Sequence, residues 1–164
     1  MPADTKSEKP AFMEKAVLWD KGNKISDFEE GKEFAHHWGR TLFSGDCTLY
    51  ASLTQMYNPL YFNEEFAKSC GHPTIVVAPL LVFNTIVGLS VEDLSIRGPF
   101  VSIDDVIFHR PVYAGDTLRA SSECLSKRMS ESRPGQAIVS WKTEGFNQRD
   151  ERVISYVRSN LLFE

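Results

Sequence analysis

Hydrophobic and polar residues alternate most regularly in the last segment of the chain, residues 153–163. Successive side chains of a strand point to opposite faces of its sheet. The two sets would be Val153, Ser155, Val157 and Ser159 on one face, and Ile154, Tyr156, Arg158 and Asn160 on the other. Three earlier segments are also strand-like: residues 101–113, 117–128 and 136–147. Turn sequences such as Ala114-Gly115-Asp116 separate them, so we expect four consecutive antiparallel strands.

A further strand and a helix are expected before this region. Residues 28–41 contain apolar and aromatic side chains typical of a first strand. Ser44 or Asp46 would cap a helix over residues 47–56. One face of this helix would carry its larger apolar side chains, Leu49, Tyr50 and Leu53. Asn58-Pro59 should end the helix, because the residue before a proline disfavours helical geometry.

The most apolar stretch covers residues 75–91. It is shorter than the roughly 20 residues that a membrane span needs and includes polar Asn84, so it predicts a buried core helix. Pro79 suits the first turn of such a helix, and Gly88 would lie near its end. A strand, helices and then four antiparallel strands make an α+β pattern. We expect an antiparallel sheet wrapped around one long central helix.

Length, charge and cysteine spacing narrow the functional classes. The 164 residues suffice for one domain, expected over residues 25–164 after a flexible polar leader, residues 1–24. A net charge of −4 argues against nucleic acid as a partner, and no polybasic segment favours a membrane surface. The three cysteines, Cys47, Cys70 and Cys124, form no C-x-x-C pair. This excludes a zinc ribbon or thioredoxin-like motif and fits the cytoplasm.

Several separated motifs occur together in one order. They are Gly39-Arg40-Thr41, Asn58-Pro59-Leu60, Phe108-His109-Arg110-Pro111-Val112-Tyr113-Ala114-Gly115-Asp116-Thr117-Leu118, Ser132-Arg133-Pro134-Gly135 and Gly145-Phe146-Asn147-Gln148. Together they resemble the MaoC-like (R)-specific hydratase/dehydratase family, and the last two resemble the branch related to mesaconyl-CoA hydratase. The resemblance covers residues 28–163.

This resemblance implies a hotdog fold, a homodimer or higher homo-oligomer, and an acyl-CoA thioester as ligand. It implies no cofactor, since coenzyme A would be part of the substrate. Mesaconyl-CoA hydratase has two such domains in one chain, whereas this chain has length for one. Two chains would therefore have to associate, and the second could be a different hotdog chain.

The loop of residues 54–63 departs from the family pattern D-x-N-P-x-H, in which Asp and His form an acid–base pair. Met56 occupies the Asp position and Tyr61 the His position. Met56 cannot transfer a proton, while Tyr61 can donate a hydrogen bond, although its reference pKa of about 10 suits general-base work at neutral pH poorly. Tyr61 and Asn58 remain catalytic candidates, and Met56 and Tyr57 candidates for contact with the substrate. The alternatives are packing on a partner chain for Tyr61 and turn formation for Asn58.

The thioester oxygen of such a substrate needs a hydrogen-bond donor. In the family this is commonly a backbone amide at the start of the central helix. Pro79 has no amide hydrogen, so Leu80 or Leu81 would have to supply it.

Other ionisable residues are candidates with structural alternatives. Asp46 could be a relocated base or a first-turn acid of a helix, and His72 could replace the lost imidazole or lie in solvent. Arg110 and Arg133 could meet a carboxylate or a coenzyme A phosphate, or be solvated surface residues. His36 and His37 should point to opposite faces of a strand. With no third ligand suitably spaced, we expect no metal site.

Three functions remain open at this stage. The first is a hydratase or dehydratase for a branched, or dicarboxylic, acyl-CoA. The second is a non-catalytic hotdog subunit that binds thioester and pairs with a catalytic chain, as the altered loop would suit. The third is a thioesterase, which would require Asp46 or Glu64 in the pocket.

Overall fold

The computed structural model describes residues 22–94 and 98–163. In chain order, its elements are η2 (Ile25–Asp27), β1 (Glu33–Thr41), α1 (Ser44–Thr54), η3 (Pro59–Tyr61), α2 (Glu64–Ser69), α3 (Pro79–Leu94), β2 (Phe100–Phe108), β3 (Thr117–Met129), β4 (Gln136–Phe146) and β5 (Arg152–Phe163). Most of the expected leader lies outside the described residues. None of the described helices is both long and apolar enough to cross a membrane.

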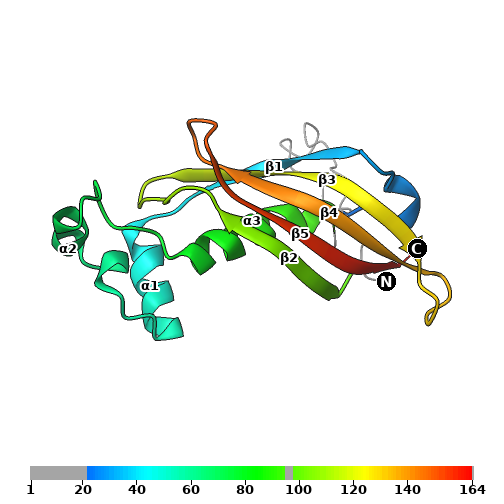
Figure 1. The fold of residues 1–164 in the computed structure, drawn as a ribbon, viewed down its shortest axis with the longest axis horizontal. Coiled ribbons are helices and arrows are strands. Elements are labelled where there is room, and N and C mark those ends of the chain that lie inside the picture. The colour runs from blue at the N-terminus through cyan, green and yellow to red at the C-terminus, as the bar shows by residue number, and fades with distance from the viewer. Residues whose placement is uncertain (1–21, 95–97, 164) are drawn as a thin grey trace, which may run out of the picture.

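The five strands form one antiparallel sheet in the order β1-β3-β4-β5-β2. The long helix α3 lies along one face of this sheet, while α1 and α2 project beyond one end of it (Figure 1). The expected α+β architecture, an antiparallel sheet with one long helix against it, is therefore confirmed. Strand β4 alternates buried and half-buried residues along its whole length, because one of its faces is covered by α3.

The core lies between α3 and the sheet. Val82 and Ile86 of α3 pack among Leu118, Val153, Ile154 and Tyr156, and Leu94 at the other end of α3 packs with Phe28, Trp141 and Leu162. Gly145 of β4 lies directly against Ile86 of α3. A Cβ atom there would lie 2.8 Å from the Ile86 Cδ1 atom and 2.7 Å from the Ile154 Cγ2 atom. Gly145 thus leaves the room that Ile86 occupies.

Several element boundaries differ from expectation for local reasons. The first strand begins at Glu33 rather than 28, since residues 25–27 form a 3₁₀ turn. Helix α1 covers Ser44–Thr54 and stops before Met56, because Gln55 adopts a left-handed conformation (φ 56°). The strand expected over residues 101–113 is shorter, because β2 covers Phe100–Phe108.

The central helix is displaced towards the C-terminus relative to the expected 75–91. Residues 75–78 are extended, with Val76 in a β-bridge to Tyr113, so the helix starts at Pro79. It continues past Gly88 to Leu94. The apolar signal covered both an extended segment and the helix, and hydrophobic periodicity does not separate the two when both are buried.

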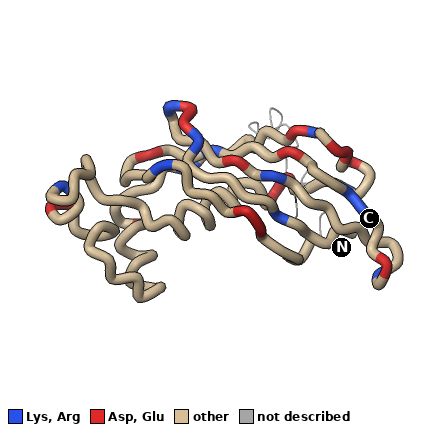
Figure 2. The backbone as a smooth tube through the Cα atoms, in the orientation of Figure 1, with Lys and Arg blue, Asp and Glu red and all other residues tan. Residues whose placement is uncertain are grey.

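The face expected for α1 is not the face that it buries. Cys47 and Ala51 pack inward, whereas Leu49 and Leu53 are 60% and 75% exposed. Figure 2 shows few charged residues on this projecting helix. Burial raises the pKa of the Cys47 thiol to about 11, so this cysteine is a packed and unreactive side chain.

The two histidines of β1 do not point to opposite faces. Between Ala35 and Gly39 the strand advances four residues while β3 advances two, from Ser121 to Arg119. This irregularity turns both rings towards α3, where His36 Nδ1 lies 2.7 Å and His37 Nδ1 3.6 Å from carboxylate oxygens of Asp93. The expectation of strict alternation was wrong because it assumed a regular strand.

Replacing Gly145 with alanine should lower the free energy of unfolding by about 1–3 kcal/mol, because the new methyl group must displace Ile86 or Ile154. Gly88→Ala is the matched control, since no atom lies within 4 Å of its ideal Cβ position. It should raise the free energy of unfolding by about 0.5–1 kcal/mol, as expected for alanine in a helix interior. Chemical denaturation measures both, and equal effects of the two substitutions would contradict this packing.

Candidate active site

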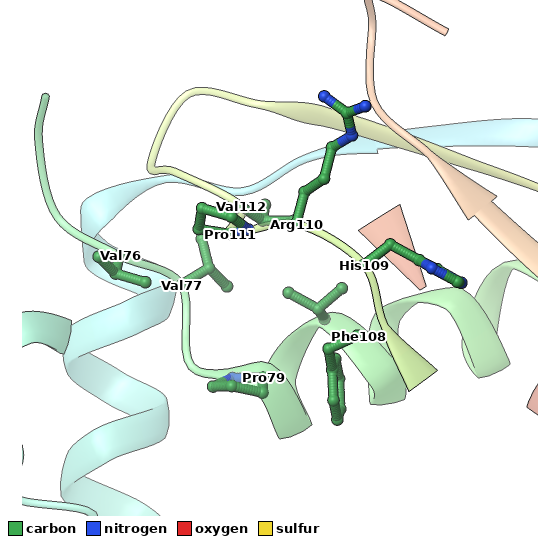
Figure 3. Close-up of a pocket in the computed structure, with 9 residues that line it drawn as sticks. Val76, Val77, Pro79, Phe108, His109, Arg110, Pro111 and Val112 are labelled. Atoms are coloured by element: carbon green, nitrogen blue, oxygen red, sulfur yellow. The ribbon is translucent and has the colours of Figure 1, made fainter. Parts of the chain in front are cut away.

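A pocket of about 270 Å³ opens at the N-terminal end of α3. Its lining residues come from the segment before α3, the start of α3 and the segment after β2: Val76, Val77, Pro79, Val82, Phe108, His109, Arg110, Pro111 and Val112. Figure 3 shows Phe108 and Pro79 facing each other across its lower part. The walls are mostly apolar, as in a typical small-molecule site.

Backbone hydrogen bonds hold the two walls of the pocket together. The Val77 amide donates to the Val112 carbonyl at 2.8 Å, and the Ala114 amide donates to the Ile75 carbonyl at 3.0 Å. The Val76 amide donates to the Leu60 carbonyl at 3.0 Å. This last bond attaches the loop of residues 54–63 to a residue that lines the pocket.

The motif that contains Asp116 and the motif that contains Gln148, about 30 residues apart in the sequence, contact each other beside this pocket. Asp116 is 5% exposed and accepts hydrogen bonds from the Tyr113 amide at 2.9 Å and from Gln148 Nε2 at 2.7 Å. The Gln148 Oε1 atom accepts from the Thr117 amide at 3.0 Å. Asp116 and Thr117, in the turn that follows the pocket wall, are therefore hydrogen-bonded to Gln148 in the turn between β4 and β5.

The start of α3 offers one backbone donor towards solvent. The Leu81 amide is occupied, since it donates to the Ala78 carbonyl at 2.9 Å. No hydrogen bond joins the Leu80 amide to any described residue, and Leu80 is half-exposed. Of the two residues expected to supply a donor, Leu80 thus has the available amide, at a helix end that favours negative charge.

The altered loop keeps a defined shape. Asn58 caps the short helix η3, and its Oδ1 atom accepts a hydrogen bond from the Leu60 amide at 3.1 Å. This is the turn-forming role left open for Asn58. The Tyr61 side chain is half-buried, and its hydroxyl makes no hydrogen bond to a described residue. Met56 is half-buried and Tyr57 is exposed, so both remain accessible from the loop surface.

Asp46 is engaged at the start of α1. One carboxylate oxygen accepts from the Phe43 amide at 2.8 Å, and the other lies 2.9 Å from an Arg40 guanidinium nitrogen. The N-cap residue of α1 is Phe43, so Asp46 is not the N-cap but the first-turn acid that the sequence left open, bonding back to the N-cap amide as in a capping box. Because both oxygens are occupied and Asp46 does not line the pocket, the geometry favours structure over catalysis at this residue.

His72 lies behind one wall of the pocket. Its Nδ1 atom is 3.2 Å from the Tyr113 hydroxyl, and the two rings are 5.9 Å apart between centroids. Tyr113 follows Val112, a lining residue, but His72 itself does not line the pocket. The loop after α2 therefore does not carry its imidazole into the cavity.

The two arginine candidates have different positions. Arg110 lines the pocket rim, where its guanidinium bonds to Glu151 at 2.9 Å and extends away from α3 (Figure 3). Arg133 is exposed in the hairpin between β3 and β4, at the end of the sheet far from α1 and α2 (Figure 1). The structure therefore does not bring Arg133 to this pocket of its own chain.

His109 is a lining residue that was not among the candidates. Its Nε2 atom lies 2.8 Å from Ser155 Oγ, which turns the ring towards β5. Desolvation, helped by Arg152, lowers the pKa of His109. Its place directly before Arg110 in the motif was the signal available in the sequence. Among the described residues, no cluster of three or more His, Cys, Asp or Glu side chains could hold a metal ion.

Comparison with known proteins identifies the family. The family described as Mesaconyl-CoA hydratase matches residues 3–163 of this chain. The chain belongs to this family. The mesaconyl-CoA hydratase of Haloarcula hispanica is 34% identical over 154 residues, which are 93% of this chain and 43% of that protein. The chain thus spans less than half the length of this relative.

Solved structures agree with the mesaconyl-CoA hydratase family assignment. A MaoC domain protein dehydratase from Chloroflexus aurantiacus superimposes with a TM-score of 0.84 at 30% identity, over 91% of this chain and 42% of that one. A Mycobacterium tuberculosis protein with a double hotdog fold superimposes with a TM-score of 0.76 at 23% identity. It matches 86% of this chain and 44% of its own length, and shows the fold.

For this member of the mesaconyl-CoA hydratase family, the two interpretations of Asp46 predict different outcomes. If Asp46 is the first-turn acid, Asp46→Ala should lower the free energy of unfolding by about 1 kcal/mol, because the Phe43 amide loses its acceptor. Thioester binding, measured by calorimetry, should be unchanged. Ser44→Ala, at the exposed first residue of α1, should change neither quantity. Loss of binding without loss of stability would contradict the structural role.

Proposed function

We propose that this chain adds water to, or removes it from, an enoyl thioester of coenzyme A, as a hydro-lyase. The observation that carries the proposal is a mostly apolar pocket at the N-terminus of α3, in a chain of the mesaconyl-CoA hydratase family. We propose a branched or dicarboxylic acyl group like that of mesaconyl-CoA. Coenzyme A enters as part of the substrate, and the reaction needs no other cofactor.

Hydration requires three events at the substrate. The hydroxyl of water bonds to the β-carbon while a base takes its proton, the α-carbon gains a proton, and the thioester oxygen carries developing negative charge. The Leu80 amide is the proposed donor to that oxygen, since it has no described partner and lies at a helix N-terminus. The apolar walls exclude bulk water and strengthen this interaction.

Tyr61 is the proposed proton-transferring or hydrogen-bonding group of the loop. Its hydroxyl is uncommitted among the described residues, and the adjacent Leu60 carbonyl is bonded to Val76 in the pocket wall. Asn58 supports Tyr61 by shaping η3. Met56 and Tyr57 are proposed to contact the substrate on the loop side, and Arg110 to meet an anionic part of it at the rim.

A second function is favoured by the same loop. Met56 replaces a carboxylate and Tyr61 an imidazole, and the lining residues include no Asp or Glu. A degenerate subunit that binds thioester and pairs with a catalytic hotdog chain would have these features. In that case a second hotdog unit would carry the catalytic groups. A thioesterase has no such support, because Asp46 is engaged by Arg40, Glu64 by Lys68, and neither lines the pocket.

The proposed partner surface is the free edge of the sheet at β2. Every residue of this strand except Ser102 is exposed, although Val106 and Ile107 are apolar. An apolar edge strand is available to pair with another strand. We propose that a second copy of the chain, or a second hotdog chain, pairs here. The free state of all three cysteines supports a reducing, cytoplasmic location.

The decisive experiment is a hydration assay of the purified chain with mesaconyl-CoA and crotonyl-CoA, following enoyl-thioester absorbance. Tyr61→Phe should lower kcat by about 10²–10⁴-fold, the usual contribution of a general acid or base. Tyr50→Phe on α1, which removes a hydroxyl outside the loop, should leave kcat unchanged. Undiminished turnover in Tyr61→Phe would remove Tyr61 from the chemistry. Absence of turnover with retained thioester binding would favour the degenerate subunit.

Assembly through β2 is tested by Ile107→Lys, followed by light scattering after gel filtration. The added charge on an apolar edge should convert an oligomer to a monomer. Met129→Lys is the matched control, because Met129 is similarly exposed at the far end of β3. An oligomer that persists in Ile107→Lys would place the interface elsewhere. A wild-type chain that is already monomeric would require the second hotdog chain.

A further inference from the structure

A series of polar side chains crosses the interior at the end of α3 opposite the pocket. His36 and Ser122 are 7% and 4% exposed, and Thr143 is fully buried. His36 Nδ1 lies 2.7 Å from Asp93 Oδ2, and His36 Nε2 lies 2.9 Å from Ser122 Oγ. Ser122 Oγ lies 2.8 Å from Thr143 Oγ1. One imidazole therefore connects β1 to α3, β3 and β4.

Which group donates each hydrogen bond in this series depends on whether the His36 ring is neutral or protonated. Beside a carboxylate, the neutral ring carries its hydrogen on Nδ1 and donates it to Asp93. The Nε2 atom then accepts from the Ser122 hydroxyl, which in turn can accept from Thr143. A protonated ring would donate from Nε2 as well, so the Ser122 hydroxyl would have to turn round. With a neutral His36 ring, each hydrogen bond of the series therefore has one donor and one acceptor.

Asp93 also holds the end of α3 to the N-terminal part of the described chain. Its backbone carbonyl accepts a hydrogen bond from the Asn23 side chain. The next residue, Leu94, is fully buried and packs with Phe28 and Trp141. The irregularity in β1 at residues 36–38 aims His36 at this point, as such irregularities often do for functional side chains.

The charged groups around His36 come from three elements. Asp93 of α3 favours the charged ring, while His37 of β1 and Arg158 of β5 disfavour it. Glu92 of α3 lies 3.9 Å from His37 Nε2, within the same group of side chains.

Burial is the largest influence on the ring and outweighs Asp93, so the pKa of His36 is lowered from 6.5. On β5, burial raises the pKa of Tyr156, which therefore stays neutral in this range.

We propose that His36 is a pH-sensitive latch, which in its neutral form fastens the last turn of α3 to β1 and β3 and on protonation releases that turn. When the latch opens, the His36 ring is no longer buried and binds a proton more readily than it does in the closed state. The latch is therefore fully closed above pH 6.5 and weakens as the pH falls below 6.5 towards the lower pKa of the folded state. The proposal does not depend on the chemistry of the pocket.

The test is amide hydrogen exchange of residues 91–94 between pH 5.0 and 7.5, corrected for intrinsic rates, with ¹⁵N NMR of the histidine rings. In the wild type the opening constant should rise by up to about tenfold for each pH unit below 6.5, the limit for one proton. The His36 ring should show the Nδ1–H tautomer at pH 7.5. An Nε2–H tautomer, a pKa above 6.5, or pH-independent opening would overturn the proposal.

Three variants distinguish opening that is controlled by His36 from a general loss of stability at acidic pH. His36→Asn keeps a donor for Asp93 but does not titrate, so its opening constant should not vary with pH. Asp93→Asn removes the group that favours the charged ring, so it should lower the pKa of His36 further. His109→Asn removes a histidine at the other end of α3 and should leave the wild-type pH dependence intact. If His36→Asn does not fold, the Asp93→Asn titration alone decides, since an unchanged or raised pKa would contradict the proposed pair.

Discussion

The contact between α3 and the sheet is the interaction on which the other features depend. Ile86 packs in the space that Gly145 leaves open, and the residues on either side of this point form the two clusters of the core. A helix of 16 residues is about 24 Å long. Fixing α3 on the sheet therefore fixes both of its ends, with the Leu80 amide at the pocket and Asp93 beside His36. These two places are too far apart to share side chains.

Backbone contacts explain how the loop keeps its form while its chemistry changes. The Leu60 carbonyl bonds to Val76, and Asn58 caps η3, and neither contact involves the side chains at positions 56 and 61. The family's acidic and imidazole groups can therefore be replaced by Met56 and Tyr61 without loss of the loop. This separation of shape from chemistry makes an altered catalyst and a binding subunit equally compatible with the fold. The difference between them lies in what the Tyr61 hydroxyl does.

The exposed apolar surfaces indicate that one chain does not cover all of its own hydrophobic area. Strand β2 has an uncovered edge, and α1 presents Leu49 and Leu53 to solvent. A continuous exposed apolar surface usually marks an interaction site.

The sequence by itself determined the α+β class, the strand order along the chain and the family. These depend on alternation, turn residues and motif order, all of which are local in the chain. It also predicted the structural alternatives, a first-turn acid for Asp46 and turn formation for Asn58, because such contacts span two or three residues. Tertiary structure alone decided that 75–78 is extended, that Leu80 rather than Leu81 offers its amide, and that His36 and His37 both meet Asp93. The first and the last depend on neighbours distant in sequence, namely the 112–114 wall and the irregular pairing of β1 with β3, and the second depends on where α3 starts. Hydrophobic pattern carries no information about such pairings, because it records how much a residue is buried but not by what.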